Sequence, residues 1–438
     1  MTFNRTPSKV GQIQMLPPTV KNSIIFVDDD QNILNGLRRM LHFMREQWDM
    51  VFVVSGQDAL KAMEGCPVDV IVSDMRMPEM DGAQLLTQVK LLYPETVRII
   101  FSGHSEEQLI FKTVGPAHQF IAKPSSPEII VNILSRSIKL RSILNIKALK
   151  SLVASLEGLP TPPKNYFSLI NLLEAKNSTR ADIAKALSRD IALTAQTMKL
   201  TNSAYFGLPK HVENVAQAVA LLGTDTIKAL VLATGYFHFY TGILEVADKI
   251  ELLCQRSFSI GAVARELALF EGSAPEVVDQ AGSAGTLSHI GTLILIAHSY
   301  EKFKEAMEFV DNLSYSLIEA EEESFGVSHQ KLGAYLLGLW GFTDPIVEAV
   351  AFHHTPQLVN VVSKCPLVFV YIAQVLLAHI DPQTGVIDQK STGLDIDYLK
   401  NVWHQDHDNM KGRIRLWSDI VLEGHSSIRH STRCLTPS

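Results

Sequence analysis

The sequence has few cysteines and no excess of basic residues. Its 438 residues include four cysteines, and no two of them form a CxxC pair. This spacing predicts neither a zinc ribbon nor a disulfide framework, and it favours a reducing compartment. The 39 lysines and arginines are outnumbered by 46 aspartates and glutamates, which gives a net charge of -7. That balance argues against a broad basic surface for DNA, RNA or anionic lipid.

Long apolar runs are also missing. Nowhere do about 18 apolar residues follow one another without interruption, as a membrane-spanning helix requires. The most apolar stretch, residues 281–300, contains Ser288, His289 and His298, and therefore predicts a buried helix. The first residues lack the apolar segment and cleavage site of a secretory signal. We expect a cytoplasmic protein with large cores, since 46% of its residues are hydrophobic and 19% charged.

The N-terminal region alternates short branched apolar runs with helix-like segments. The runs are SIIFV, MVFVV, VDVIVS, TVRIIF and QFIA, between residues 22 and 125. Continuous apolar strands are typical of a parallel sheet covered on both faces. We therefore predict an α/β, flavodoxin-like, doubly wound parallel five-stranded domain at 22–140, after a flexible lead-in at 1–21.

The rest of the chain has a helical pattern. Residues 128–157 predict a linker helix, whose apolar stripe packs on its own domain or forms a dimer or interdomain seam. The Gly158–Pro163 segment breaks the chain. We expect an all-α domain at 158–425, with a core at 158–355 and a C-terminal extension, and a disordered tail at 426–438. The stripe consists of Ile146, Leu149, Val153 and Leu156.

Polar side chains follow the predicted strands at their carboxyl ends. The first strand runs into VDDD (27–30), the third into SD (73–74), the fourth into FSG (101–103) and the fifth into AKP (122–124). In a parallel sheet these groups meet at one edge. Clustered carboxylates repel one another unless a cation joins them, and oxygen-rich clusters suit Mg²⁺. The sequence therefore predicts a magnesium site at this edge.

With these motifs, and with SDMRMPEMDG at 73–82, the region resembles a response-regulator receiver domain. The resemblance implies that Asp74 accepts a phosphoryl group from a sensor histidine kinase or phosphotransfer protein. It also implies that Asp28, Asp29 and Asp74 hold Mg²⁺ together with the backbone carbonyl of Arg76.

The same resemblance assigns three further roles. Ser102 is the switch hydroxyl that engages the phosphoryl oxygens, and Lys123 pairs with the phosphoryl group. Phe120 is the aromatic residue that changes rotamer on activation. Lys123–Pro124 is expected to be a cis peptide.

The helical region contains LPTPP, ALSRDIALTAQTMKLTNSAYFG and AGTLSHIGTLIL in order, and it resembles the HDOD domain. HDOD domains are related to HD metal-dependent phosphohydrolases, which hold metal with histidines and aspartates. Aligned to those ligands, this sequence has Arg256, the pair Ser288–His289, and Gln374. The resemblance thus implies a degenerate hydrolase site, no metal and a regulatory role.

Three further histidines, His329, His353 and His354, leave two interpretations open. They form a residual metal site, with His289 and a carboxylate from the run 321–323, or they hydrogen-bond buried backbone. We favour the second, since metal-binding histidines usually need supporting ligands and an ordered surrounding shell. A charge run is also usually a solvated helix face.

Together these features predict a two-component response regulator that is not an enzyme apart from its own phosphorylation. It would signal through an unidentified protein partner, and homodimerisation is possible. The alternative is a phosphorylation-controlled, metal-dependent cyclic-dinucleotide phosphodiesterase. Direct DNA binding is not expected, because no helix-turn-helix with a basic recognition helix follows the first domain.

Overall fold

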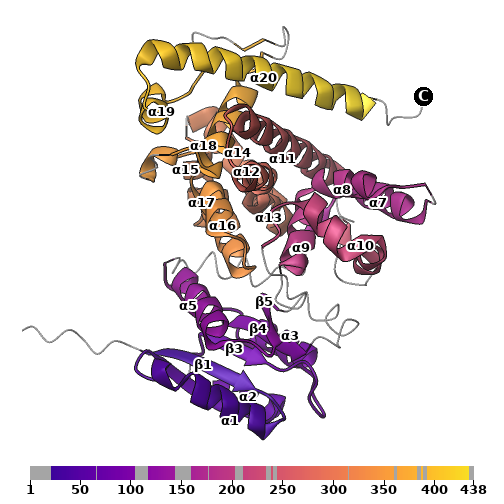
Figure 1. Ribbon diagram of the computed structural model, residues 1–438, viewed down its shortest axis with the longest axis vertical. Coiled ribbons are helices and arrows are strands. Elements are labelled where there is room, and N and C mark those ends of the chain that lie inside the picture. Colours follow the sequence, from indigo (N-terminus) through magenta and orange to yellow (C-terminus); the bar gives the residue numbers. More distant parts are fainter. Residues whose placement is uncertain are drawn as a thin grey trace, which may run out of the picture.

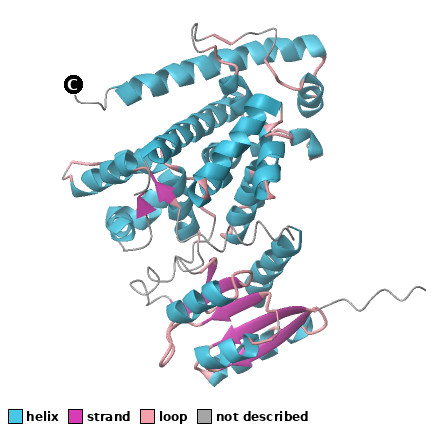
Figure 2. Ribbon diagram, turned by 180° about the vertical axis from the view of Figure 1, so that it is seen from behind, coloured by secondary structure: helices cyan, strands magenta, loops and turns pink. Residues whose placement is uncertain are grey.

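The computed structural model describes residues 21–65, 67–103, 117–143, 159–175, 177–202, 211–232, 238–239, 244–313, 315–359, 363–381, 386–387 and 392–433. The described chain forms an α/β domain followed by a helical domain, and the two are stacked along the long axis of the molecule (Figure 1). The five-stranded sheet lies in the first domain, and one short strand pair lies among the helices of the second (Figure 2).

The N-terminal domain contains five parallel strands in the order β2-β1-β3-β4-β5. Strand β3 is buried along its whole length, as expected for a strand whose two faces are covered. This is the flavodoxin-like architecture that the sequence predicted. The elements are β1 (Asn22–Val27), α1 (Gln31–Met40), η1 (His42–Met44), β2 (Trp48–Val53), α2 (Gly56–Met63), β3 (Val70–Ser73), α3 (Gly82–Leu92), β4 (Val97–Gly103), β5 (Gln119–Lys123) and α5 (Pro127–Ile143).

The helical domain is organised around α11, which packs against α12, α18 and α20. One short strand pair, β6 with β7, departs from the predicted all-helical pattern, since prolines at 160 and 162 oppose helix there. Within the described ranges, no helix is both long and apolar enough to cross a membrane. The elements are β6 (Pro160–Thr161), α7 (Pro163–Glu174), α8 (Arg180–Ser188), α9 (Ile191–Thr201), α10 (Val215–Leu232), β7 (His238–Phe239), α11 (Leu244–Phe270), α12 (Pro275–Leu287), α13 (Ile290–His298), α14 (Tyr300–Leu313), α15 (Leu317–Phe325), α16 (His329–Leu339), α17 (Asp344–Phe352), η3 (Pro356–Leu358), α18 (Pro366–Ala378), α19 (Ile396–Trp403) and α20 (His407–Arg433).

The structure can be compared with the boundaries that the sequence predicted before and after the helical domain. The linker-helix positions Ile146, Leu149, Val153 and Leu156 lie outside the described residues, as do lead-in residues 1–20. Helix α20 continues to Arg433, so the expectation of a disordered tail from residue 426 is wrong for 426–433. Once the first turns of a helix are held in place, each further turn adds little cost in free energy, so the helix extends into a polar segment. The polar composition of the segment alone did not indicate this.

That anchor is the buried carboxylate of Glu271 at the end of α11. It accepts hydrogen bonds from the indole nitrogens of Trp403 (2.7 Å) and Trp417 (2.9 Å) and pairs with Arg413. Two indole donors, the Arg413 guanidinium and the Lys364 ammonium (2.9 Å) satisfy the buried charge. Helices α19 and α20 are thereby fixed to the core of the helical domain.

The domains meet where α5 and the start of β5 face α9, α16 and the turn after α16. The Gln119 side chain donates to the Leu339 carbonyl (2.7 Å), and the Lys199 ammonium donates to the Ala117 carbonyl (2.9 Å). Arg136 on α5 donates to the Phe342 carbonyl and pairs with Asp344 (2.8 Å). The α16–α17 hairpin is therefore the part of the helical domain that touches the sheet domain most directly.

Candidate functional site

The acidic residues predicted at the sheet edge do converge. Asp28 follows β1 and Asp74 follows β3, and the parallel register sets Val27 beside Ser73. Lys123 ends β5, next to β4, with Gly103 as its register partner. Asp28 is 2% exposed and Asp74 is 7% exposed, whereas Asp29 lies exposed at the rim. The edge therefore combines two buried carboxylates with one open to solvent.

The Lys123 ammonium joins the two buried carboxylates. It bonds Asp28 (2.6 Å) and also Asp74. The second Asp74 oxygen accepts from the Arg76 backbone N–H (2.7 Å), and Asp28 accepts from the Asp30 backbone N–H (3.0 Å). The cis Lys123–Pro124 peptide expected from the motif is present. One lysine thus orients both carboxylates and compensates one of their two negative charges.

Burial dominates the electrostatics of this edge. It raises the pKa of Asp28, and the hydrogen bond and charge of Lys123 reverse only part of that effect. For Lys123, burial alone would lower the pKa, but the bonds and charges of Asp28 and Asp74 raise it overall. The lysine is therefore held in its charged form, as a fixed positive point beside the acids.

The predicted switch residues lie on the neighbouring strands. Ser102 is buried on β4, and Phe120 is buried on β5, directly after Gln119 of the interdomain contact. The predicted Mg²⁺ ligands are oxygen donors, the type that Mg²⁺ prefers. The edge offers three carboxylates against the single ammonium of Lys123, so the residues present fit a divalent cation.

The degenerate hydrolase positions also lie together, in the helical domain. Ser288 is the C-cap of α12; its hydroxyl donates to the Gly285 carbonyl, and its oxygen accepts from His289 Nδ1 (2.8 Å). Gln374 on α18 donates to the His353 carbonyl. Arg256 on α11 lies close enough for its charge to lower the pKa of His289 and of His354, after the larger effect of burial.

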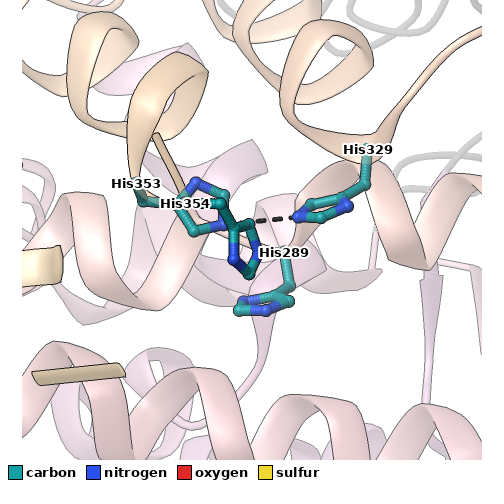
Figure 3. A group of neighbouring side chains, drawn as sticks. All are labelled: His289, His329, His353 and His354. Atoms are coloured by element: carbon teal, nitrogen blue, oxygen red, sulfur yellow. Dashed lines mark hydrogen bonds between the residues drawn. The ribbon is translucent and has the colours of Figure 1, made fainter. Parts of the chain in front are cut away.

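The three additional histidines join His289 in one cluster (Figure 3). One nitrogen from each of His289, His329, His353 and His354 lies within 4.8 Å of the other three. The first three side chains are buried, and His354 is half-buried. Burial lowers the pKa of His353 well below its usual value, and the neighbouring imidazoles lower it further. Burial, with a smaller contribution from the neighbouring His329 ring, lowers the pKa of His354 to about 3.

The partner of this cluster is Glu321, from the run that the sequence offered as a source of a carboxylate but that we expected to be solvated. The charge run predicted a solvated face, but Glu321 is fully buried and accepts from the His329 backbone N–H (2.8 Å) and Nδ1 (2.6 Å). Only Glu322 and Glu323 follow the expectation, with Glu322 paired to Lys331 near the surface. A helical phase places one glutamate of such a run inward, which a periodicity test of 321–325 could have detected.

Sequence reasoning missed the basic residues at the interdomain contact. Lys199 on α9, Arg98 on β4 and His118 before β5 are all buried there. Burial, with a smaller contribution from the Arg98 charge, lowers the pKa of Lys199 to about 7. No short motif marks these positions, because the two domains that bury them are far apart in sequence.

Comparison with known proteins agrees with this division of the chain. The response regulator receiver domain model matches residues 24–135, and the HDOD domain model matches residues 159–356. The hydrogenase transcriptional regulatory protein HoxA of Bradyrhizobium diazoefficiens is 35% identical over 124 residues, which are 28% of this chain and 25% of HoxA. An uncharacterized Treponema pallidum protein is 22% identical over 222 residues, 51% of this chain and 42% of that protein.

The chain thus spans less than half the length of these curated relatives. Among solved structures, the MmoQ response regulator from Methylococcus capsulatus covers 57% of this chain and 99% of its own, at 20% identity and a TM-score of 0.42. The two family models and the two domains of the fold lead to one assignment. The chain joins a response regulator receiver domain, at residues 24–135, to an HDOD domain, at residues 159–356.

Proposed function

We propose that this response regulator acts in the cytoplasm, accepts a phosphoryl group on Asp74 and passes the signal through a non-hydrolytic HDOD domain to a protein partner. One observation carries the proposal: Lys123 joins Asp28 and Asp74 at a buried edge, while the Arg76 amide orients Asp74. Phosphoryl transfer mainly needs positioning and charge neutralisation, which this arrangement supplies.

In the transfer step, an Asp74 carboxylate oxygen attacks phosphorus of a phosphohistidine, and an O–P bond forms as the P–N bond breaks. The electron pair leaves with the imidazole nitrogen of the kinase or phosphotransfer protein. Mg²⁺, held by Asp28, Asp29, Asp74 and the Arg76 carbonyl, would neutralise charge on the phosphoryl group. The Lys123 ammonium would supply a second positive charge beside the phosphoryl group, and the Ser102 hydroxyl would donate a hydrogen bond to a phosphoryl oxygen.

Strand β5 connects the acidic edge to the contact with the HDOD domain. A phosphoryl group brings about 1.5 to 2 negative charges to Asp74, and it competes for Lys123 at the end of β5. The same strand begins with Gln119, which donates to Leu339 at the end of α16. Displacement of Lys123 and Phe120 would therefore change how β5 meets the α16–α17 hairpin.

The HDOD domain is proposed to regulate rather than hydrolyse. Arg256, Ser288 and Gln374 stand where the related hydrolases place metal ligands, so the set of ligands that activates water in those enzymes is incomplete. The remaining histidine cluster contains no carboxylate ligand. Binding of a downstream protein, with or without pairing of two copies, is the output that remains.

Labelling by acetyl phosphate with Mg²⁺ tests the acceptor. We expect one phosphoryl group per wild-type chain by intact-mass spectrometry, and none in Asp74→Asn. Asp30→Asn is the matched control, because the Asp30 side chain only caps α1, through a 2.8 Å bond from the Asn32 N–H. Labelling of Asp74→Asn at the wild-type level would show that the acceptor is another residue.

A turnover assay tests the alternative, a cyclic-dinucleotide phosphodiesterase, which the histidine cluster favours. We expect no product from a cyclic dinucleotide with Mn²⁺ or Zn²⁺ present, before or after acetyl phosphate treatment. Turnover that disappears in His353→Ala would establish the enzyme and contradict the proposed role.

A further inference from the structure

The histidine cluster has a hydrogen-bond pattern that defines which nitrogen of each ring is free. His329 Nδ1 is bonded to the Glu321 carboxylate (2.6 Å), and His353 Nδ1 is bonded to the Val350 carbonyl (2.9 Å). A carboxylate and a carbonyl only accept, so each Nδ1 carries the hydrogen. In the neutral rings, both Nε2 atoms therefore present lone pairs.

These two Nε2 atoms lie 3.3 Å apart inside the core. Two lone pairs at this distance repel one another unless a cation lies between them. Two nitrogens bound to tetrahedral Zn²⁺ at about 2.0–2.1 Å are separated by about 3.3 Å. The observed separation therefore equals the spacing of two ligands on one zinc ion.

The other two rings complete the set. The Ser288 hydroxyl donates to the Gly285 carbonyl (2.8 Å), so its oxygen accepts from His289 Nδ1, and His289 Nε2 is left free. His354 Nε2 is buried without a hydrogen-bond partner among the described residues. Four imidazole nitrogens thus converge, and three of the rings are oriented by a group behind Nδ1.

We propose that His289, His329, His353 and His354 bind one divalent transition-metal ion, with Zn²⁺ the best match, as a closed structural site. Imidazole suits zinc, copper, iron and nickel, and the spacing favours tetrahedral coordination. The Glu321–His329 pair is the carboxylate–histidine arrangement that usually supports a bound metal. This replaces the sequence-based expectation of a metal-free helical domain, which treated Glu321 as a surface residue.

A closed site differs from a hydrolytic one. Catalytic zinc sites use three protein ligands and leave one position for water, whereas four imidazoles fill the tetrahedral shell. The ion would therefore stabilise the fold without activating water. The inference is compatible with the regulatory role proposed for the HDOD domain and adds a ligand to it.

The site lies at one end of the hairpin that touches the receiver domain at the other. Helix α16 begins at His329 and ends at Leu339, whose carbonyl accepts from Gln119. Helix α17 begins at Asp344, the partner of Arg136, and is followed by His353 as its C-cap. Bound metal would fix the hairpin end opposite the receiver contact. This consequence rests on the proposed function, but the metal site itself does not.

Metal content of the full-length protein tests the inference. Protein stripped with a chelator and dialysed against Zn²⁺ with excess Mg²⁺ should retain one zinc per chain by elemental analysis. His353→Ala should lose it, and His407→Ala should keep it, since the His407 side chain is 50% exposed on α20. Asp74→Asn should also keep it, which separates this site from the acidic edge and from the proposed function.

Two further measurements keep the test decisive if His353→Ala does not fold. Co²⁺ bound to the stripped wild-type protein should give the intense visible absorption of tetrahedral coordination. Glu321→Gln should weaken zinc binding about 10- to 100-fold in a chelator competition, with the fold retained. Wild-type protein that retains far less than one zinc per chain, or an octahedral Co²⁺ spectrum, would overturn the inference.

Discussion

The acidic edge of the receiver domain and the histidine cluster of the HDOD domain both place several polar groups close together in a buried position, but they differ in ligand type and in access from solvent. At the edge, Lys123 bonds both buried carboxylates and compensates one of their two charges, and the exposed Asp29 lies open to solvent. In the cluster, neutral rings turn their lone pairs inward, and the supporting acceptor Glu321 is fully buried. An open oxygen site suits exchange of Mg²⁺ and phosphoryl groups, whereas a closed nitrogen site suits a permanently held ion.

Removing zinc should produce the largest effect and should affect only the helical domain. At a free zinc concentration about 1,000 times the Kd, binding stabilises the fold by about 4 kcal/mol, which corresponds to a melting shift on the order of 10 °C. We expect chelation to lower the melting temperature of wild-type protein by this amount. Scanning calorimetry of His354→Gln should show almost no response to the chelator, and an equal response would contradict the assigned ligand.

Lys123→Met should break the acidic edge and leave the histidine cluster intact. Without the ammonium, two buried carboxylates repel the incoming phosphoryl group, and the rate of acetyl phosphate labelling should fall about 100-fold or more. Lys61→Met, on the exposed side of α2, is the matched control. Zinc content should be unchanged in both variants, and near-normal labelling of Lys123→Met would refute the role of this lysine.

The domain contact offers a smaller effect with an internal control. Arg136→Ala leaves the carbonyl of buried Phe342 without its charged donor, so the free energy of unfolding should fall by about 2 kcal/mol. Asp344→Asn removes the other partner, whose side chain is 90% exposed, and should cost less than about 0.5 kcal/mol. Equal losses in denaturant titrations would mean that the ion pair, rather than the carbonyl contact, holds the domains together.

The smallest effect is a pH dependence from Lys199. The unfolded chain keeps this lysine protonated up to its ordinary pKa of 10.5, whereas burial lowers the folded pKa to about 7. Between these values the unfolded state binds more protons, so the free energy of unfolding should rise with pH, by about 1 kcal/mol per unit. Below about pH 7 both states are charged and this contribution is flat.

Comparison of wild-type protein with Lys199→Met isolates that contribution. Denaturant titrations between about pH 6 and pH 9 should give a difference in unfolding free energy that grows above neutral pH. A difference that stays constant with pH would show that Lys199 remains charged at the domain contact.

Local sequence was enough to predict the receiver sheet and the convergence of its acids. Parallel strands bring their carboxyl ends to one edge, so Asp28, Asp74 and Lys123 could be placed without knowing any long-range contact. The cis Lys123–Pro124 peptide came from the family motif. The predicted roles of these residues in phosphorylation stay predictions until the labelling experiment is done.

The sites of the helical domain were harder to predict, because each combines residues from helices that no local sequence pattern brings together. His289 and His329 become neighbours because Gly291 lets α13 approach α16, where a Cβ would lie 2.0 Å from the His329 carbonyl oxygen. Glu321 faces inward through the phase of α15. The burial of Lys199 depends on the other domain, which helical periodicity cannot report.

Hydrogen exchange at the α16–α17 turn tests the central claim, that phosphorylation of the edge is felt at the hairpin. With acetyl phosphate and Mg²⁺, amides of residues 340–343 in wild-type protein should exchange faster, as the contacts of Gln119 and Arg136 weaken. Asp74→Asn should show no change. Exchange that is identical with and without phosphorylation in fully labelled wild-type protein would contradict the account.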